Sequence, residues 1–91
     1  MVDGAILKRV IITNELGMHA RPAARIARLA AQASSGIRII KDGETVDATS
    51  IIDILSLGCT KGDSIDIKID NPADMDILNR ICRLIENGFT E

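Results

Sequence analysis

The clearest pattern in the chain is the regular alternation of isoleucine with polar residues over residues 64–70. Ile65, Ile67 and Ile69 lie on one side of an extended chain, and charged residues lie on the other. Side chains of a strand alternate between the two faces of its sheet. The segment therefore predicts a strand in a sheet that is covered on one face only.

Three further segments predict strands. Residues 5–13 are apolar and rich in Val and Ile, although their alternation is imperfect. Residues 37–41 and 44–48 flank the pair Asp42 and Gly43. Both residues of that pair tolerate positive φ angles, so the pair predicts a tight hairpin between two antiparallel strands.

The segment 20–33 shows helical spacing of small apolar residues. Pro22 suits the first turn, where its missing N–H would have no partner within the helix, so His19 or Ala20 is expected at the N-cap. The expected inner stripe consists of Ala23, Ile26, Ala27 and Ala30. Because these side chains are small, the helix is expected to approach the sheet closely.

Two more helices are predicted farther along the chain. A short, unusually apolar helix lies between a natural N-cap, Ser50, and a terminating glycine, Gly58. Residues 71–74, Asn-Pro-Ala-Asp, predict an N-cap, a first-turn proline and an acidic first turn for the last helix, which runs to about 87–88. Its expected inner face consists of Met75, Leu78, Ile81, Cys82 and Ile85.

The order of elements is therefore βαββαβα. Four strands with one apolar face predict an α/β (α+β) fold, a two-layer open-faced β-sandwich in which three helices cover a four-stranded, mainly antiparallel sheet. The length of 91 residues fits a single domain, 1–91, in which residues 1–4 form a short N-terminal extension.

Composition excludes several classes of function. The net charge of −2 and the lack of a basic patch with interleaved aromatic residues argue against nucleic-acid binding. The chain has no signal peptide and no apolar run long enough to span a bilayer, so we expect a cytoplasmic protein without membrane insertion. Cys59 and Cys82 are expected to be reduced and structural. No phosphate loop, dinucleotide fingerprint or zinc-type histidine pair is present, which predicts no metal and no cofactor.

His19, the only histidine, stands where the first strand-like segment gives way to the first helix. A lone histidine is more often structural than functional. Here, however, the expected helix start and Arg21, two residues on, favour a bound anion through backbone N–H groups, the helix dipole and a guanidinium. An exposed imidazole in this setting can form a covalent intermediate and pass it on.

Two surface features could serve partners. Arg21, Arg25 and Arg28 form a basic stripe on the first helix, either a solvated face or a docking rim for an acidic surface. The short helix has more apolar residues than one face can bury, so some must be exposed. We expect its exposed apolar residues to be Ile51, Ile52 and Leu55.

Residues 17–23, with the pattern G-x-H-x-R-P-A, resemble the active-site signature of HPr, the histidine-containing phosphocarrier of the bacterial phosphoenolpyruvate-dependent sugar phosphotransferase system. Residues 50–58 are similar to the family's second segment, around a regulatory serine. The resemblance implies that Nδ1 of His19 accepts phosphate from phosphorylated enzyme I and donates it to an EIIA or EIIB component. It also implies that Arg21 holds the phosphoryl group, and that Gly17 and Pro22 shape the site.

The resemblance further implies a docking patch beside His19, made by the exposed apolar residues of the short helix with the arginine stripe at its rim. It implies a monomeric carrier rather than a stand-alone enzyme. In many bacteria the serine that matches Ser50 is phosphorylated by HPr kinase/phosphorylase. Here Thr49 replaces the basic residue common before that serine, and Asp53 puts a negative charge inside the patch.

Two alternatives remain open at this point. One is a regulatory relative, either a nitrogen-branch phosphocarrier or a protein that signals mainly through Ser50. The other is a small α/β binding module without phosphoryl chemistry, in which His19 would be buried against the core. The sequence names neither the sugar nor the EII components.

Overall fold

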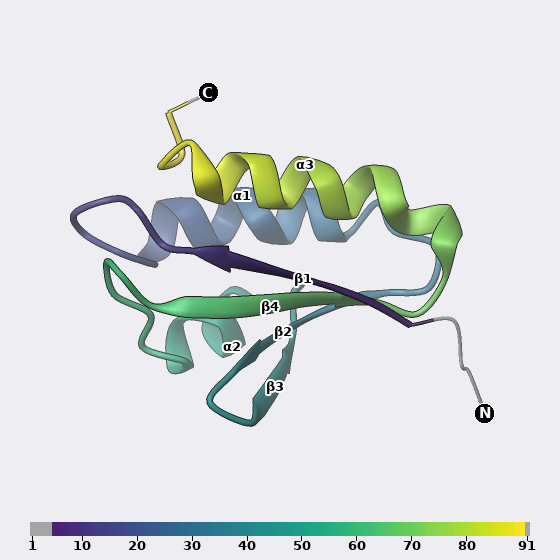
Figure 1. Ribbon diagram of the computed structural model, residues 1–91, viewed down its shortest axis with the longest axis horizontal. Helices are drawn as coiled ribbons and strands as arrows, with labels where there is room; N and C mark the ends of the chain where they lie inside the picture. Colours follow the sequence, from purple (N-terminus) through teal and green to yellow (C-terminus); the bar gives the residue numbers. More distant parts are fainter. Residues whose placement is uncertain (1–4, 91) are drawn as a thin grey trace.

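The computed structural model describes residues 5–90, so the expected N-terminal extension, 1–4, lies outside the described residues. A four-stranded sheet carries helices on the face that bears its buried isoleucines (Figure 1). The elements in chain order are β1 (Ile6–Ile11), α1 (Ala20–Ala30), β2 (Ile37–Lys41), β3 (Glu44–Asp47), α2 (Ile51–Ser56), β4 (Ser64–Ile69), a 3-10 turn η1 (Pro72–Asp74) and α3 (Met75–Glu86).

The strand order in the sheet is β1-β4-β2-β3, and all three neighbouring pairs are antiparallel. In the register, Val10 lies opposite Ile65, and Ile39 lies opposite Ile67. Helices α1 and α3 run side by side along the sheet, while α2 packs against α1 and β3 (Figure 1). The predicted open-faced fold with the order βαββαβα is therefore confirmed.

The alternation of side chains explains why only one face is covered. Ile65, Ile67 and Ile69 are buried, as their spacing predicts. The imperfect alternation of the first strand resolves in the same way, because Val10 is 3% exposed and its neighbour Ile11 is 52% exposed. The outer face of the sheet thus remains open.

The predicted inner stripe of α1 is confirmed, since Ala23, Ile26, Ala27 and Ala30 are all buried. On α3 the prediction needs one change. Met75 is half-buried and packs against the core as predicted, but Leu84, which the spacing did not assign to the inner face, is buried as well. Helix α3 packs against both α1 and the sheet, so its buried stripe is wider than a single contact surface requires.

The predicted helix 20–33 is too long, because α1 ends at Ala30. Beyond this helix end, the Asp74 carboxylate accepts the backbone N–H groups of Ser34 at 2.6 Å and Ser35 at 2.9 Å. Asp74 is 2% exposed and ends the η1 turn. The predicted start of the last helix is confirmed, with Asn71 as the N-cap, Pro72 in the first turn and Asp74 as the first-turn acid. The Asp74 carboxylate also orders the chain that leaves α1.

The local turn and capping predictions are confirmed. Asp42 and Gly43 have φ angles of 51° and 83°, which a two-residue hairpin turn requires. The Ser50 hydroxyl oxygen accepts the Asp53 N–H at 3.2 Å and so caps α2. Gly58, just beyond the end of α2, has a φ angle of 64°.

The loop between β1 and α1 lies directly on the loop between α2 and β4. The Met18 N–H donates to the Cys59 carbonyl oxygen at 3.0 Å, and Ile12 exchanges backbone hydrogen bonds with residues 62 and 63. Gly17 has a φ angle of 65°, and a Cβ atom there would lie 2.6 Å from the Cys59 carbonyl oxygen. Only glycine fits this approach of two backbones. We call this contact the 17–59 seam.

The cysteines are free, buried thiols. Burial raises the pKa of the Cys59 thiol, and it raises the pKa of Cys82 to about 11. Neither is therefore a thiolate near neutral pH, which agrees with a structural role. Among the helices within residues 5–90, none has the length and apolar character needed to cross a membrane.

The 17–59 seam predicts unequal effects of two glycine substitutions with the same backbone angle. Gly58→Ala meets open space at a φ angle of 64°, so it should lower the free energy of unfolding by only about 1 kcal/mol. Gly17→Ala has the same backbone strain and also collides with backbone atoms of the other loop, so the loss should be about 3 kcal/mol or more. Urea denaturation measures both, and equal losses would contradict the steric role of Gly17.

The Asp74 contact predicts a pH dependence of stability. Hydrogen bonds from the Ser34 and Ser35 N–H groups lower the pKa of Asp74 in the folded state. The stabilisation is therefore complete above the unfolded pKa of about 3.9 and is lost as the pH falls through the lower folded value. The stability advantage of the wild type over Asp74→Asn, which cannot ionise, should shrink below about pH 4 in urea denaturation. An advantage that is constant over this range would contradict the ionised contact.

Candidate functional site

His19 occupies the N-cap of α1. Its carbonyl oxygen accepts the Ala23 N–H at 3.0 Å, while its side chain makes no capping hydrogen bond. The N–H groups of Ala20 and Arg21 have no acceptor within the helix, and Pro22 has no N–H to leave unpaired. The imidazole is half-buried, so it does not lie in the core as the binding-module alternative requires.

The imidazole faces a small hollow of about 160 Å³. Two segments far apart in the sequence form it, namely the start of α1 with the loop before it, and the chain just after α3. The lining residues are Asn14, His19, Arg21, Pro22, Arg25, Gly88 and Phe89. Pockets that hold a separate small-molecule substrate usually measure about 300–1,000 Å³. The hollow is smaller than that range, which suits a group carried on the protein itself.

The far wall of the hollow is the C-terminal cap of α3. Gly88 has a φ angle of 63°, and the Phe89 N–H donates to the Leu84 carbonyl oxygen at 2.9 Å, the pattern of a Schellman motif. Arg25 Nη1 then donates to the Phe89 carbonyl oxygen at 2.8 Å. One arginine of α1 therefore ties the helix that begins at the histidine to the end of α3.

Asn14 orders the loop before α1. Its Nδ2 donates to the Gly17 carbonyl oxygen at 2.7 Å, three residues farther along. Its Oδ1 is buried and accepts no hydrogen bond within residues 5–90. The carboxamide thus holds the loop by its nitrogen and leaves an acceptor beside the histidine hollow.

The arginine stripe of α1 separates in space. Arg21 is exposed and lines the histidine hollow together with Arg25. Arg28, one turn farther along, instead lines a groove between α1 and α3, which Arg25 also borders. The sequence brought these three residues together as one stripe, whereas the structure brings only Arg21 and Arg25 to the histidine.

The apolar residues of α2 are exposed as the sequence predicts. Ile51, Ile52 and Leu55 are 39%, 78% and 36% exposed, while Ile54 is fully buried. Asp53 is exposed between them, and Ser50, at the start of the helix, is half-buried. We call Ile51, Ile52 and Leu55 the α2 patch.

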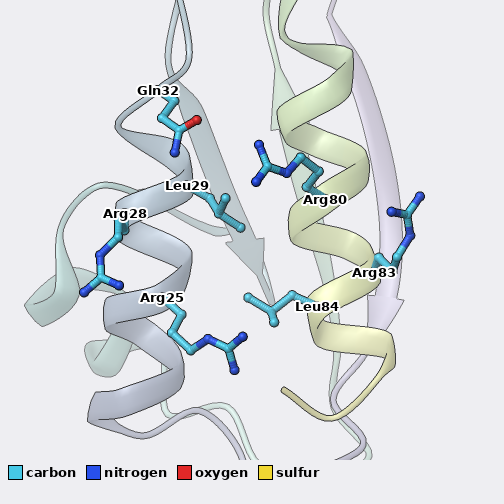
Figure 2. A pocket seen from close by; sticks show the side chains of 7 residues that line it. All are labelled: Arg25, Arg28, Leu29, Gln32, Arg80, Arg83 and Leu84. Atoms are coloured by element: carbon cyan, nitrogen blue, oxygen red, sulfur yellow. The ribbon is translucent and has the colours of Figure 1, made fainter. Parts of the chain in front are cut away.

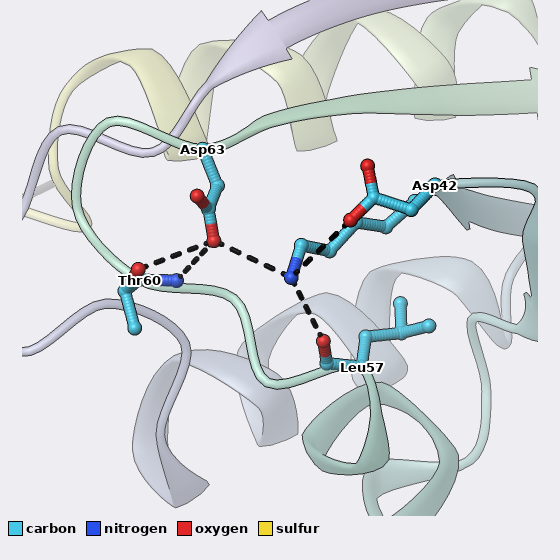
Figure 3. A network of polar contacts seen from close by, with 5 residues as sticks. Asp42, Leu57, Thr60 and Asp63 are labelled. Carbon is cyan, nitrogen blue, oxygen red and sulfur yellow. Dashed lines mark hydrogen bonds and ion pairs between the residues drawn. The ribbon is translucent and has the colours of Figure 1, made fainter.

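A polar network holds the end of α2 in place (Figure 3). Lys41 Nζ donates to the Leu57 carbonyl oxygen at 3.1 Å and lies 3.5 Å from the Asp63 carboxylate. That carboxylate accepts the Thr60 N–H at 2.8 Å, which lowers the pKa of Asp63. The network orders the loop that contains Cys59, the residue that binds the loop before α1. The α2 patch and the histidine are therefore positioned by the same loop.

We did not predict Asn14, Phe89 or Lys41 as residues of this region from the sequence. One signal for Phe89 was available, because it is the only aromatic residue and follows an Asn-Gly pair at a helix end. Nothing local marked Lys41. Within residues 5–90, no group of three or more His, Cys, Asp or Glu side chains is arranged to bind a metal ion.

The site can stabilise a small dianionic group. Unpaired N–H groups at a helix start and a nearby guanidinium both stabilise phosphate oxygens. A histidine can accept a phosphoryl group as a nucleophile and release it again as a leaving group. No deep cavity is needed, because the transferred group would remain attached to the protein.

Comparisons with known proteins agree with this chemistry. A family model described as PTS HPr component phosphorylation site matches residues 6–87. The phosphocarrier protein HPr of Treponema pallidum is 33% identical over 86 residues, which cover 94% of this chain and 98% of that protein. The phosphocarrier protein NPr of Klebsiella oxytoca is 34% identical over 87 residues, with 94% and 97% covered.

A solved structure supports the same assignment. The crystal structure of HPr-C-His from Thermoanaerobacter tengcongensis superposes with a TM-score of 0.87 and 34% identity, covering 94% of this chain and 97% of that one. Fold, family model and relatives therefore agree, and the chain belongs to the HPr family of phosphocarrier proteins of the phosphotransferase system.

Proposed function

We propose that this protein carries a phosphoryl group on Nδ1 of His19, received from phosphorylated enzyme I and passed to an EIIA or EIIB component. The observation that carries the proposal is the position of the imidazole at the N-cap of α1, half-buried and facing a hollow that Arg21 also lines. The family's phosphocarrier role supports it.

The transfer needs few groups. The Nδ1 lone pair attacks phosphorus, the new P–N bond forms, and the bond to the donor's leaving atom breaks in line with it. The N–H groups of Ala20 and Arg21 and the Arg21 guanidinium stabilise the phosphoryl oxygens. The second transfer reverses these roles, with His19 as the leaving group. A shallow site helps, because a carrier must release its group to the next protein.

We propose that partners dock on the α2 patch. Its exposed isoleucines and leucine give apolar area, and Arg25 and Arg28 give positive charge on the neighbouring helix. Asp53 adds a negative charge to the patch and favours partners with a basic group opposite it. Docking on the α2 patch needs this face to be open, so we propose that the protein is a monomer. We also propose that it works in the cytoplasm.

A nitrogen-branch phosphocarrier is the second candidate, and the similarity to proteins named NPr supports it. Transfer rates to sugar-specific EII components and to a nitrogen-branch acceptor would distinguish the two. Signalling through Ser50 is a further proposal, and its hydroxyl oxygen caps α2. A phosphate on Ser50 would place negative charge at the edge of the α2 patch and weaken docking of acidic partners.

The residue that carries the phosphoryl group can be identified by mass. Incubation with enzyme I and phosphoenolpyruvate should increase the intact mass by one phosphoryl group, labile in acid and stable in base. His19→Ala should abolish the increase. Thermal unfolding of this variant should remain cooperative, because the half-buried ring makes no capping hydrogen bond. Phosphorylation retained by His19→Ala would reject the assignment.

The role proposed for Arg21 can be tested by kinetics. Because its exposed guanidinium stabilises the transferring group, Arg21→Ala should slow phosphorylation by enzyme I about 10²-fold. The matched control is Arg9→Ala, which removes an exposed arginine that pairs with Asp66 on the sheet. Stopped-flow or quench kinetics should show an unchanged rate for the control. An equal rate for the wild type and Arg21→Ala would contradict the role of this arginine.

A further inference from the structure

The chain just after α3 adopts a backbone conformation that is unfavourable for its sequence. Phe89 has a φ angle of 64°, in the left-handed region that bulky side chains avoid. Within residues 5–90, the only other residue of this kind that is not glycine is Asp42, whose φ angle the hairpin turn requires. A Schellman motif accounts for the left-handed Gly88 but does not require the same of the next residue. The end of the helix therefore does not by itself explain the conformation of Phe89.

Three contacts hold Phe89 in this conformation. Its N–H donates to the Leu84 carbonyl oxygen at 2.9 Å, and its carbonyl oxygen accepts Arg25 Nη1 at 2.8 Å. Arg25 projects from α1 toward α3, and Leu84 lies on the facing side of α3 (Figure 2). The Phe89 side chain is half-buried and packs against the hydrophobic core. Its backbone and its side chain are thus both fixed in place.

The segment that Phe89 fixes forms one wall of the histidine hollow. Gly88 and Phe89 line the hollow together with His19. A Cβ atom at position 88 would lie 3.4 Å from Thr13 Oγ1 and 3.8 Å from Asn14 Cβ, so this segment lies directly on the loop before α1. We call Gly88 and Phe89 the 88–89 wall.

A phosphoryl group on His19 can be lost in two ways. In productive transfer, an atom of the acceptor protein attacks phosphorus in line with the P–N bond. In hydrolysis, a water oxygen attacks instead: the new P–O bond forms, the P–N bond breaks, and one water proton passes to the imidazole as inorganic phosphate leaves. Excluding water from a reactive intermediate suppresses this side reaction. A carrier therefore benefits from a wall that blocks water on one side and leaves the approach of the acceptor open.

We propose that Phe89 is a positioning residue, which holds the 88–89 wall against the histidine hollow and so slows hydrolysis of the carried phosphoryl group. This inference rests on the proposed phosphorylation of His19. It gives a reason for the unfavourable backbone, because in this conformation the Phe89 side chain packs against the core while its carbonyl oxygen binds Arg25. Of the residues that line the hollow, none belongs to α2, so the wall leaves the α2 patch uncovered.

The test compares the lifetimes of the phosphorylated proteins. The wild type and Phe89→Ala are phosphorylated with enzyme I and phosphoenolpyruvate, both reagents are removed, and the loss of one phosphoryl group is followed by intact mass at neutral pH. Phe89→Ala should still accept the group but lose it to water about tenfold faster, because its wall is no longer anchored. Phe89→Leu, which keeps an apolar side chain for the core, should restore most of the protection.

Two further variants keep the test specific. Phe89→Asn removes the apolar contact but tolerates the left-handed backbone, so it should keep the fold and still lose the group faster than the wild type. The matched control is Leu16→Ala, which removes a large side chain that is 76% exposed, three residues before His19, and does not line the hollow. Its phosphorylated form should be hydrolysed at the rate of the wild type.

Three results would overturn the proposal. Equal hydrolysis rates for the wild type, Phe89→Ala and Phe89→Asn would leave Phe89 as a contact of the core only. An equal acceleration in Leu16→Ala would mean that any loosening near His19 admits water. No increase in mass of the wild type would overturn the proposed phosphorylation together with this inference, whereas the first two results overturn this inference alone.

Discussion

The close backbone contact between the loop before α1 and the loop after α2 determines how the rest of this protein is arranged for function. In the 17–59 seam, the Met18 N–H donates to the Cys59 carbonyl oxygen, and the second loop leaves no space for a side chain at position 17. The second loop is held in turn by Lys41, which also binds the end of α2. The N-cap histidine and the exposed patch of α2 are therefore held by one connected set of contacts, although His19 and Ser50 are 31 positions apart in the sequence.

The site itself lies where the start of one helix meets the end of another. Unpaired N–H groups at the start of α1 favour an anion, and the Schellman cap after α3 forms the opposite wall. Arg25 connects the two helix ends through the Phe89 carbonyl oxygen. It also borders the groove between α1 and α3, so one side chain reaches from the histidine hollow to that groove.

Local patterns predicted the strands, the hairpin, the cap of α2 and the inner stripe of α1, because periodicity and turn chemistry act within a few residues. Contacts between distant residues were not predictable in this way. Asp74 binds the segment after α1 from 40 residues away, and Arg25 reaches Phe89 across 64. His19 and Arg21 were found because they are only two positions apart in the sequence and form a motif. The sequence did not show that Arg28 lies apart from them, because the groove that Arg28 lines is formed by α1 together with α3.

The central claim is that the phosphoryl group rests on one nitrogen of an N-cap imidazole, against the first N–H groups of α1. Nuclear magnetic resonance of the ¹⁵N-labelled, phosphorylated protein tests it directly, through coupling of phosphorus to the imidazole nitrogens and through the amide shifts of Ala20 and Arg21. The account predicts phosphorus on Nδ1 and downfield shifts of both amides as they donate to its oxygens. Phosphorus on Nε2, or amide shifts that do not change on phosphorylation, would contradict it.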